Sequence, residues 1–272
     1  MKMKMKPKAV VIVGYGINCD RELEYAFNKA GADATRVHLK ELIGGHDMSQ
    51  YHIIAIPGGF SFADDTFSGN IFARKIACDS RLKEAFIKHL DAGRLVFGVC
   101  NGNQIGTMLN LISPSENYLG VPEVAYTTNN SARYEDRGNI HLRVVSQKSH
   151  WLKGIDILHN IPIGHGEGKF YTTEETLKDL YEKGLVVLKY VHEDGSPANH
   201  EYPVNPNGSL DDIAGLASGQ ALMLMPHPER AIEPYNQDGW TRRKSLLKRS
   251  GRQLPSEGDG MQIFRNAVNY FL

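Results

Sequence analysis

Residues 96–106 read VFGVCNGNQIG and place Cys100 between an apolar run and a polar segment. The apolar run is typical of a strand that is buried on both faces, and the residues after the cysteine predict a short helix. Gly98 and Gly102 stand two residues before and two residues after Cys100. This is the spacing of the G-x-S-x-G turn, which projects a nucleophile between a strand and a helix. The segment therefore predicts a strand, a sharp turn that carries a thiol, and a helix.

The chain before this segment alternates between strand-like and helical patterns. Strand-like runs are AVVIV (9–13), TRVHL (35–39) and HIIAI (52–56), and the helical patterns are DRELEYAFNKAG (20–31) and RLKEAFIKHLDAG (81–93). We expect Asp20 to cap the first helix and Gly31 to end it. The alternation predicts an α/β fold with a doubly wound, mostly parallel sheet, whose ligand sites lie at the carboxyl ends of the strands.

The second half of the chain predicts an antiparallel extension of this sheet. Strand-like segments are HLRVV (141–145), ILHNIPI (157–163) and the pair DIAGLASGQALMLM (212–225). A helix is expected to begin with a capping box formed by Thr172 and Glu175, and MQIFRNAVNYFL (261–272) predicts a final amphipathic helix. We expect residues 1–272 to form one domain, with a basic tail at 1–8 and a basic insertion at 241–260 that is a solvated loop.

Composition narrows the class of protein. Lys plus Arg and Asp plus Glu both number 31, so the bulk charge does not favour nucleic acid or an anionic membrane as the partner. The 3 cysteines form neither a disulfide framework nor a CxxC metal motif, which indicates a reducing compartment. Neither a signal peptide nor a long apolar segment is recognisable. We expect a cytoplasmic protein.

A nucleophilic cysteine needs a base, and the segment LMLMPHPER (222–230) supplies the best candidate. His227 follows an apolar strand, and prolines on both sides favour an extended backbone. In an extended chain Glu229 points to the same side as His227, so its carboxylate can fix the imidazole tautomer. We therefore expect a triad in which Cys100 attacks, His227 transfers the proton and Glu229 orients it.

A third motif, PGGF (57–60), follows the strand-like run HIIAI. It is therefore expected at the same edge of the sheet as Cys100. Two glycines let a backbone N–H group approach a ligand closely. We expect a backbone N–H group of this loop, paired with the amide of Asn101, to form an oxyanion hole.

Together these motifs resemble the class I, or triad, glutamine amidotransferases, which hydrolyse glutamine and pass ammonia to a synthase. The resemblance is strongest to the glutaminase components of phosphoribosylformylglycinamidine synthase. It rests on GINCDRE (16–22), PGGFSFADD (57–65), FGVCNGNQ (97–104), IPIGHGEGKFY (161–171), DIAGL (212–216) and PHPER (226–230). It implies the flavodoxin-like fold of that family, with the antiparallel extension.

The resemblance also implies further site residues. It assigns the oxyanion hole to the amides of Gly59 and Asn101. The substrate glutamine is expected to be bound by Gly58, Phe60 and Gln104. His165 and Glu167 are expected near the site or at a partner interface, without an assigned chemical role.

The implied reaction supplies ammonia to a synthetase subunit, which converts formylglycinamide ribonucleotide to formylglycinamidine ribonucleotide in purine biosynthesis. This chain has no P-loop motif, so we expect ATP and Mg²⁺ on that partner and no cofactor or metal on this chain. A small accessory subunit is a further expected partner. The basic segment TRRKSLLKRS (241–250) is a candidate for docking an acidic face of the synthetase.

Several alternatives remain at this stage. GYGINC (14–19) begins like a dinucleotide-binding G-x-G-x-x-G motif, but Cys19 replaces the third glycine. His-x-Glu occurs twice, yet no H-E-x-x-H or cysteine pair supports a metal-dependent hydrolase. A glutaminase of another class I amidotransferase, a related α/β cysteine hydrolase and a binding subunit without catalysis remain open.

Overall fold

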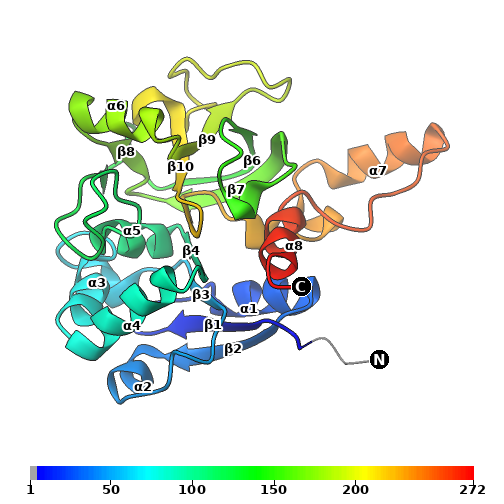
Figure 1. The fold of residues 1–272 in the computed structure, drawn as a ribbon. Coiled ribbons are helices and arrows are strands. Elements are labelled where there is room, and N and C mark those ends of the chain that lie inside the picture. The colour runs from blue at the N-terminus through cyan, green and yellow to red at the C-terminus, as the bar shows by residue number, and fades with distance from the viewer. Residues whose placement is uncertain (1–4) are drawn as a thin grey trace.

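The computed structural model describes residues 5–272, and a nine-stranded sheet runs through them (Figure 1). The strand order is β2-β1-β3-β4-β11-β10-β9-β6-β7. Its parallel part comprises β2 (Asp33–His38), β1 (Lys8–Val13), β3 (Ile53–Ile56), β4 (Leu95–Val99) and β11 (Ala221–Leu224). The predicted α/β fold with a doubly wound, mostly parallel sheet is confirmed.

The antiparallel extension is also confirmed, and it continues the same sheet through hydrogen-bonded neighbours. Its strands are β10 (Ile213–Ala217), β9 (Val186–Val191), β6 (Glu135–Val144) and β7 (Ile157–His165). β10 and β11 pair antiparallel, as expected of the two strand-like halves of residues 212–225. β6 and β7 are longer than the sequence runs indicated, and a separate pair joins β5 (Ala125–Thr127) to β8 (Lys169–Tyr171).

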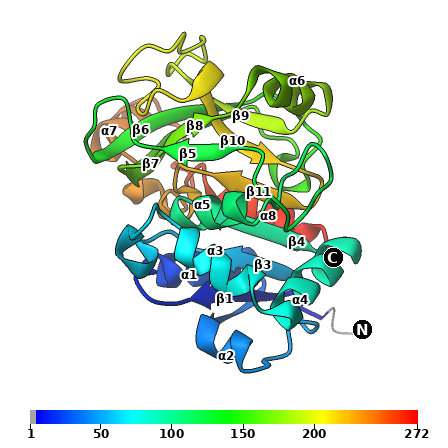
Figure 2. The same ribbon diagram turned by 90° about the vertical axis from the view of Figure 1, so that its left-hand side faces the viewer.

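Helices cover both faces of the parallel part, as Figures 1 and 2 show. α3 (Asn70–Ala77), α4 (Ser80–Asp91) and α5 (Asn101–Met108) lie on one side, and α1 (Asp20–Ala30) and α8 (Met261–Asn269) lie on the other. The remaining helices are α2 (Leu39–Ile43), α6 (Glu174–Glu182) and α7 (Trp240–Arg249), and short 3₁₀ turns cover Ser61–Asp64, His150–Leu152, Leu210–Asp212, Pro228–Arg230 and Pro234–Asn236. Among residues 5–272, none of these helices has the length and apolar character needed to cross a membrane.

An aromatic cluster packs the α1 and α8 side of the sheet. Phe27 of α1 meets Phe264 of α8 edge to face with ring centroids 5.1 Å apart, and Phe97 of β4 lies 5.2 Å from Trp151. All four side chains are fully buried. Because Trp151 and Phe264 come from the second half of the chain, the cluster ties both halves to the strand that leads into Cys100. The single domain over 1–272 stays a prediction.

Three local expectations were wrong. Asp20 is the first residue of α1 rather than its cap, because its carboxylate accepts a hydrogen bond from Arg36 at 2.9 Å. Thr173, not Thr172, caps α6 by accepting from the Thr176 amide at 3.2 Å. The Thr172 hydroxyl instead donates to the Glu123 carbonyl, so the expected capping box does not form.

The third correction concerns the basic insertion at 241–260. Half of it is helical, as α7, and no residue of this helix is buried. Figure 1 shows α7 projecting from the body of the protein. The run of Arg, Lys and Leu favours a helix by intrinsic propensity, which the expectation of a solvated loop underestimated. α2 and α3 also form where no helix was predicted.

Candidate active site

Cys100 occupies a strained turn between β4 and α5. Its backbone has φ 53° and ψ −112°, a region that non-glycine residues rarely adopt and that is often associated with function. A Cβ atom on Gly98 would lie 2.7 Å from the Gly102 carbonyl oxygen, and one on Gly102 would lie 1.9 Å from the Ile56 carbonyl oxygen. The two glycines therefore allow α5 to start directly against the ends of β3 and β4.

His227 reaches the same edge of the sheet because β11 lies parallel to β4. Its amide donates to the Pro162 carbonyl at 2.7 Å, and its Nδ1 lies 2.6 Å from Oε1 of Glu229. The expected extended backbone was wrong, because Pro228–Arg230 forms a 3₁₀ turn. The turn nevertheless brings the carboxylate of Glu229 onto the imidazole, and both side chains are buried.

Gly58 marks the point at which His227 and Cys100 approach each other. A Cβ atom on Gly58 would lie 2.7 Å from Cε1 of His227 and 3.3 Å from Cβ of Cys100. Burial alone would lower the pKa of His227, but the carboxylate of Glu229 and the sulfur of Cys100 outweigh it and raise this pKa to about 9. The imidazole is therefore held as a cation at neutral pH, beside the sulfur of Cys100.

The peptide between Gly58 and Gly59 is fixed by the loop that follows β1. The Gly58 carbonyl accepts hydrogen bonds from the amides of Asn18 and Cys19, each at 3.2 Å. Since a trans peptide points its N–H away from its C=O, the Gly59 amide faces away from this loop. Neither it nor the Asn101 amide at the start of α5 has a hydrogen-bond acceptor within residues 5–272.

The expected substrate residues differ in their surroundings. Gln104 donates from Nε2 to the Glu167 carbonyl at 2.7 Å, and its Oε1 accepts from the side chain of Asn101 at 3.1 Å. Both ends of its amide are thus bonded within the protein. Phe60 is 43% exposed and its ring lies 6.1 Å from that of Tyr134.

His165 and Glu167 contribute to the structure of the segment that follows β7. Nε2 of His165 accepts a hydrogen bond from Nδ2 of Asn207 at 3.0 Å. Burial, assisted by the charge of His227, lowers the pKa of His165 to about 3, so this ring stays neutral. The carboxylate of Glu167 accepts from the Ser68 amide at 3.0 Å. The Glu167 contact joins this segment to the loop before α3, and the His165 contact joins the end of β7 to the loop that contains Asn207.

Sequence reasoning missed three residues at this site. Arg230 donates from Nη2 to Sγ of Cys19 at 2.8 Å, which links the turn after His227 to the loop after β1. Tyr134 stands beside Phe60 and precedes β6. Cys19 and Arg230 lie in the GINCDRE and PHPER segments, which could have drawn attention to them. Tyr134 lies in no such segment, and its neighbours Phe60 and Gly164 are distant from it in sequence.

The ligand atoms of Cys19, His227 and Glu229 all lie within 4.8 Å of one another, a spacing that a metal ion can use. Nδ1 of His227 is already bonded to Glu229, and the guanidinium of Arg230 lies against the sulfur of Cys19. A cation at that position is disfavoured by the positive charge of Arg230. The arrangement fits a proton-transfer pair better than a metal centre, and the expectation of no metal stays a prediction.

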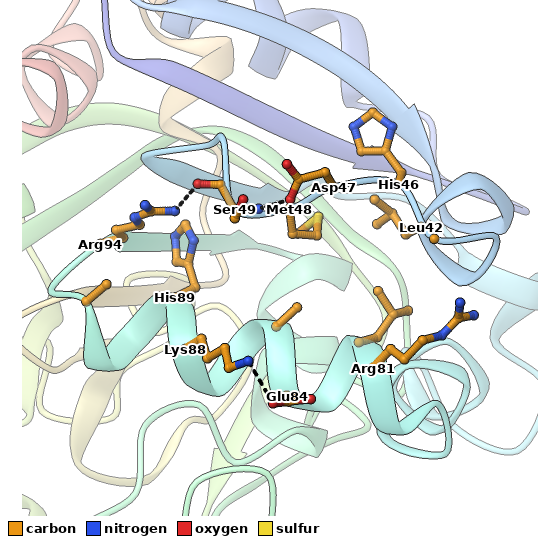
Figure 3. A pocket seen from close by; sticks show the side chains of 14 residues that line it. Leu42, His46, Asp47, Met48, Ser49, Arg81, Glu84, Lys88, His89 and Arg94 are labelled. Carbon is orange, nitrogen blue, oxygen red and sulfur yellow. Dashed lines mark hydrogen bonds and ion pairs between the residues drawn. The ribbon is translucent and has the colours of Figure 1, made fainter.

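A cavity of about 460 Å³ lies elsewhere, between α4 and the residues around Met48 (Figure 3). Leu42, Arg81 and His89 also line it. None of the predicted site residues lines this cavity, so it is separate from the thiol turn.

Comparison with known proteins agrees with this geometry. Residues 6–271 match the family model of the CobB/CobQ-like glutamine amidotransferase domain. The chain is 43% identical over 274 residues to the phosphoribosylformylglycinamidine synthase subunit PurQ of Methanococcus maripaludis, covering 99% of both chains. The PurQ subunit of Dehalococcoides mccartyi is 34% identical over 268 residues, covering 97% of this chain and 98% of the relative.

A solved structure of PurLQS from Thermotoga maritima also matches, with a TM-score of 0.70 and 28% identity. The match covers 98% of this chain and 100% of the other. Sequence and structure therefore agree over the whole length of the relatives. This chain belongs to the PurQ family, the glutamine amidotransferase subunits of phosphoribosylformylglycinamidine synthase.

Proposed function

We propose that Cys100, His227 and Glu229 hydrolyse glutamine through a thioester and that the ammonia serves a synthetase subunit. The observation that carries this proposal is the strained turn of Cys100, which lies against a buried imidazole held by a carboxylate. Few structural roles require such a turn, whereas the presentation of a nucleophile between a strand and a helix does.

In the first half of the reaction, the sulfur of Cys100, whose proton is held by His227, attacks the carboxamide carbon of glutamine. The C–S bond forms as the carbonyl π electrons move to oxygen, and the Gly59 and Asn101 amides stabilise the oxyanion. His227 then donates a proton to the amide nitrogen, the C–N bond breaks, and ammonia leaves. The Glu229 carboxylate stabilises the imidazolium throughout this step.

In the second half, water attacks the thioester while His227 accepts its proton. The C–S bond breaks, glutamate leaves and the sulfur of Cys100 is regenerated. The sum is one glutamine and one water converted to one glutamate and one ammonia. The bound glutamine is proposed to be bordered by Gly58, Phe60 and Gln104. Gln104 contributes by holding the backbone of Glu167.

The names of the relatives support a synthetase partner. The Methanococcus relative is named as a subunit of phosphoribosylformylglycinamidine synthase, and the Thermotoga structure is described as PurLQS. We propose that this chain likewise passes ammonia to a synthetase subunit that binds ATP and Mg²⁺, with a small accessory subunit in the complex. The chain itself would need no cofactor. Three unpaired cysteines support the cytoplasm as its compartment.

The test is Cys100→Ala, assayed in complex with the synthetase. The variant should lose synthesis from glutamine and retain synthesis from ammonium, because only the supply of ammonia is removed. Cys78→Ala is the matched control, since Cys78 is an exposed free cysteine and its loss should leave both activities intact. Loss of both activities in Cys100→Ala would assign Cys100 to the fold or interface, and retention of glutamine-dependent synthesis would overturn the proposed nucleophile.

A further inference from the structure

Arg230 carries a charge that no carboxylate of residues 5–272 approaches to within ion-pair distance. Its side chain is partly buried, and its one side-chain hydrogen bond goes to Cys19. None of the ion pairs formed by residues 5–272 includes it. Withdrawing a guanidinium from water is costly unless an anion compensates it. Burial would lower the pKa of Arg230, but Cys19 and the carboxylates of Glu229 and Glu22 raise it. Neither carboxylate is within ion-pair distance, so the guanidinium can still take an anionic group from outside the chain.

The unpaired side of Arg230 lies next to the nucleophile. A Cβ atom on Gly164 would lie 2.8 Å from the hydroxyl of Tyr134 and 3.9 Å from Nη1 of Arg230. The carbonyl of the same glycine lies 3.5 Å from Sγ of Cys100. Tyr134, Arg230 and Cys100 thus converge on one residue of β7. Because Cys19 takes Nη2, Nη1 is the nitrogen that remains on this side.

Tyr134 offers a second donor at the same place. Its side chain is 52% exposed, and its hydroxyl makes no hydrogen bond within residues 5–272. Burial of part of the ring, and then the nearby sulfur of Cys100, raise the pKa of Tyr134. The phenol therefore keeps its proton at neutral pH and can donate it to an acceptor.

We propose that Arg230 and Tyr134 bind the α-carboxylate of glutamine. The inference rests on the proposed function, since it concerns the end of the substrate that does not react. Glutamine attached to Cys100 through its side chain carries the α-carboxylate a short chain away. A guanidinium and a hydroxyl donor are well suited to hold a carboxylate. This contact selects glutamine over amides that lack the acid.

Cys19 acts in this proposal as a positioning residue. Burial, and next the charge of Glu229, raise the pKa of Cys19 to about 12, so it remains a thiol. It donates to Oδ1 of Asn18 at 3.1 Å and accepts from Nη2 of Arg230 at 2.8 Å. One side of the guanidinium is thereby fixed to the loop after β1.

The competing explanation is that Arg230 acts on the triad through Glu229, its neighbour in sequence. Against the effect of burial, the charge of Glu229 is one of the causes that raise the pKa of Arg230. The two residues nevertheless form no ion pair, and Oε2 of Glu229 has no hydrogen-bond partner in the described chain. A residue that served Glu229 would be expected to bond that oxygen. The two explanations also make different predictions for a substrate without the α-carboxylate. Loss of Arg230 should not affect this substrate if Arg230 binds the carboxylate, but it should if Arg230 acts on the triad.

The experiment compares glutamine with glutamine α-amide, in which a neutral amide replaces the α-carboxylate, by ammonia release from the complex with the synthetase. Arg230→Met should raise KM for glutamine by about 10²-fold, as expected for loss of a charge-assisted contact. Its kcat should change much less, and its activity on the α-amide should remain that of the unmodified protein. Arg74→Met, which removes the same charge from an exposed position of α3, is the matched control. It should leave KM and kcat unchanged for both substrates.

An equal loss on both substrates in Arg230→Met would overturn the proposal, because Arg230 would then act on the triad. Tyr134→Phe decides the matter if Arg230→Met fails to fold, since the exposed hydroxyl holds no structural bond. It should raise KM severalfold for glutamine and leave KM for the α-amide unchanged. If KM changed for neither substrate, or equally for both, the proposal would be contradicted. Failure of the proposed function is distinct, because it would leave glutamine hydrolysis intact in Cys100→Ala.

Discussion

Nδ1 of His227 lies 2.6 Å from Oε1 of Glu229, and the two side chains are buried together at the end of β11. The short contact fixes which nitrogen faces the carboxylate and leaves Nε2 for the reacting groups. It also keeps a positive charge on a buried ring, which burial by itself would remove. In the proposed reaction, Glu229 therefore positions the imidazole, and His227 supplies the proton for the departing ammonia.

The first prediction concerns the pH dependence of this pair. Glutaminase activity should fall as the pH rises through about 9, where His227 loses its proton. Glu229→Gln removes the carboxylate that raises this pKa, so the alkaline limb of the kcat/KM profile should move to lower pH. The kcat should also fall by about 10²- to 10⁴-fold, as in other triads that lose the orienting acid.

The same pair gives a stability readout. The pKa of His227 is raised from 6.5 to about 9 in the folded state, so its contribution to stability is fully present below pH 6.5 and is lost as the pH rises through 9. Thermal unfolding should show this loss in the unmodified protein and a weaker loss in Glu229→Gln. An alkaline limb that stays in place in Glu229→Gln would contradict the assignment of Glu229.

The second prediction tests the close approach at Gly58. In Gly58→Ala the new Cβ atom would lie 2.7 Å from Cε1 of His227 and 3.2 Å from Sγ of Cys19. The imidazole must therefore shift, and we expect kcat to fall by about 10²-fold with a small change in KM, because misplacement impairs the reaction step. Gly219→Ala is the control, since the nearest atom to its Cβ would be 3.9 Å away. Wild-type kcat in a folded Gly58→Ala protein would show that His227 is not confined by this contact.

The local pattern of the sequence was sufficient to predict the turn at Cys100. The two glycines and the apolar strand lie within a few residues of Cys100 in the sequence. The signals for the β10–β11 hairpin are equally close to one another in the sequence. Thr172 and Thr173 show the limit of such reasoning, because adjacent threonines are equivalent as sequence signals and only the contact with Glu123 distinguishes them. Tyr134 and Arg230 could not be paired from sequence, since they meet through the register of β7 with its neighbours.

The third prediction tests the structural role of His165. Asn207 is buried and donates from Nδ2 to the Gly168 carbonyl at 2.8 Å, besides its contacts with His165 and Tyr190. Asn207→Ala leaves these buried acceptors without a donor, which should lower the free energy of unfolding by about 2–3 kcal/mol.

Asn269→Ala, at an exposed position of α8, is the control and should change the free energy of unfolding by less than about 0.5 kcal/mol. Urea unfolding measures both. The pKa of His165 is lowered to about 3, so its ring stays neutral between pH 5 and 9. The decrease in the free energy of unfolding in Asn207→Ala should therefore be constant over this range. A loss that varies with the charge of a histidine in this range would contradict a permanently neutral His165.

The fourth prediction concerns the exposed helix α7 and the residues that follow it. The segment 242–252 carries six basic residues and no acidic one: Arg242, Arg243, Lys244, Lys248, Arg249 and Arg252. Because no residue of α7 is buried, changing Arg242, Lys244, Lys248 and Arg249 to Glu should alter the stability of the isolated chain by less than about 0.5 kcal/mol per substitution.

If α7 docks an acidic face of the synthetase, the same variant should bind that subunit at least about 10-fold more weakly. Its affinity should also depend less on salt, because screening acts on exposed charge pairs. Titration of the complex at two salt concentrations measures this. Synthesis from ammonium by the synthetase reports that the partner is intact, and an unchanged affinity and salt dependence would place the interface away from α7.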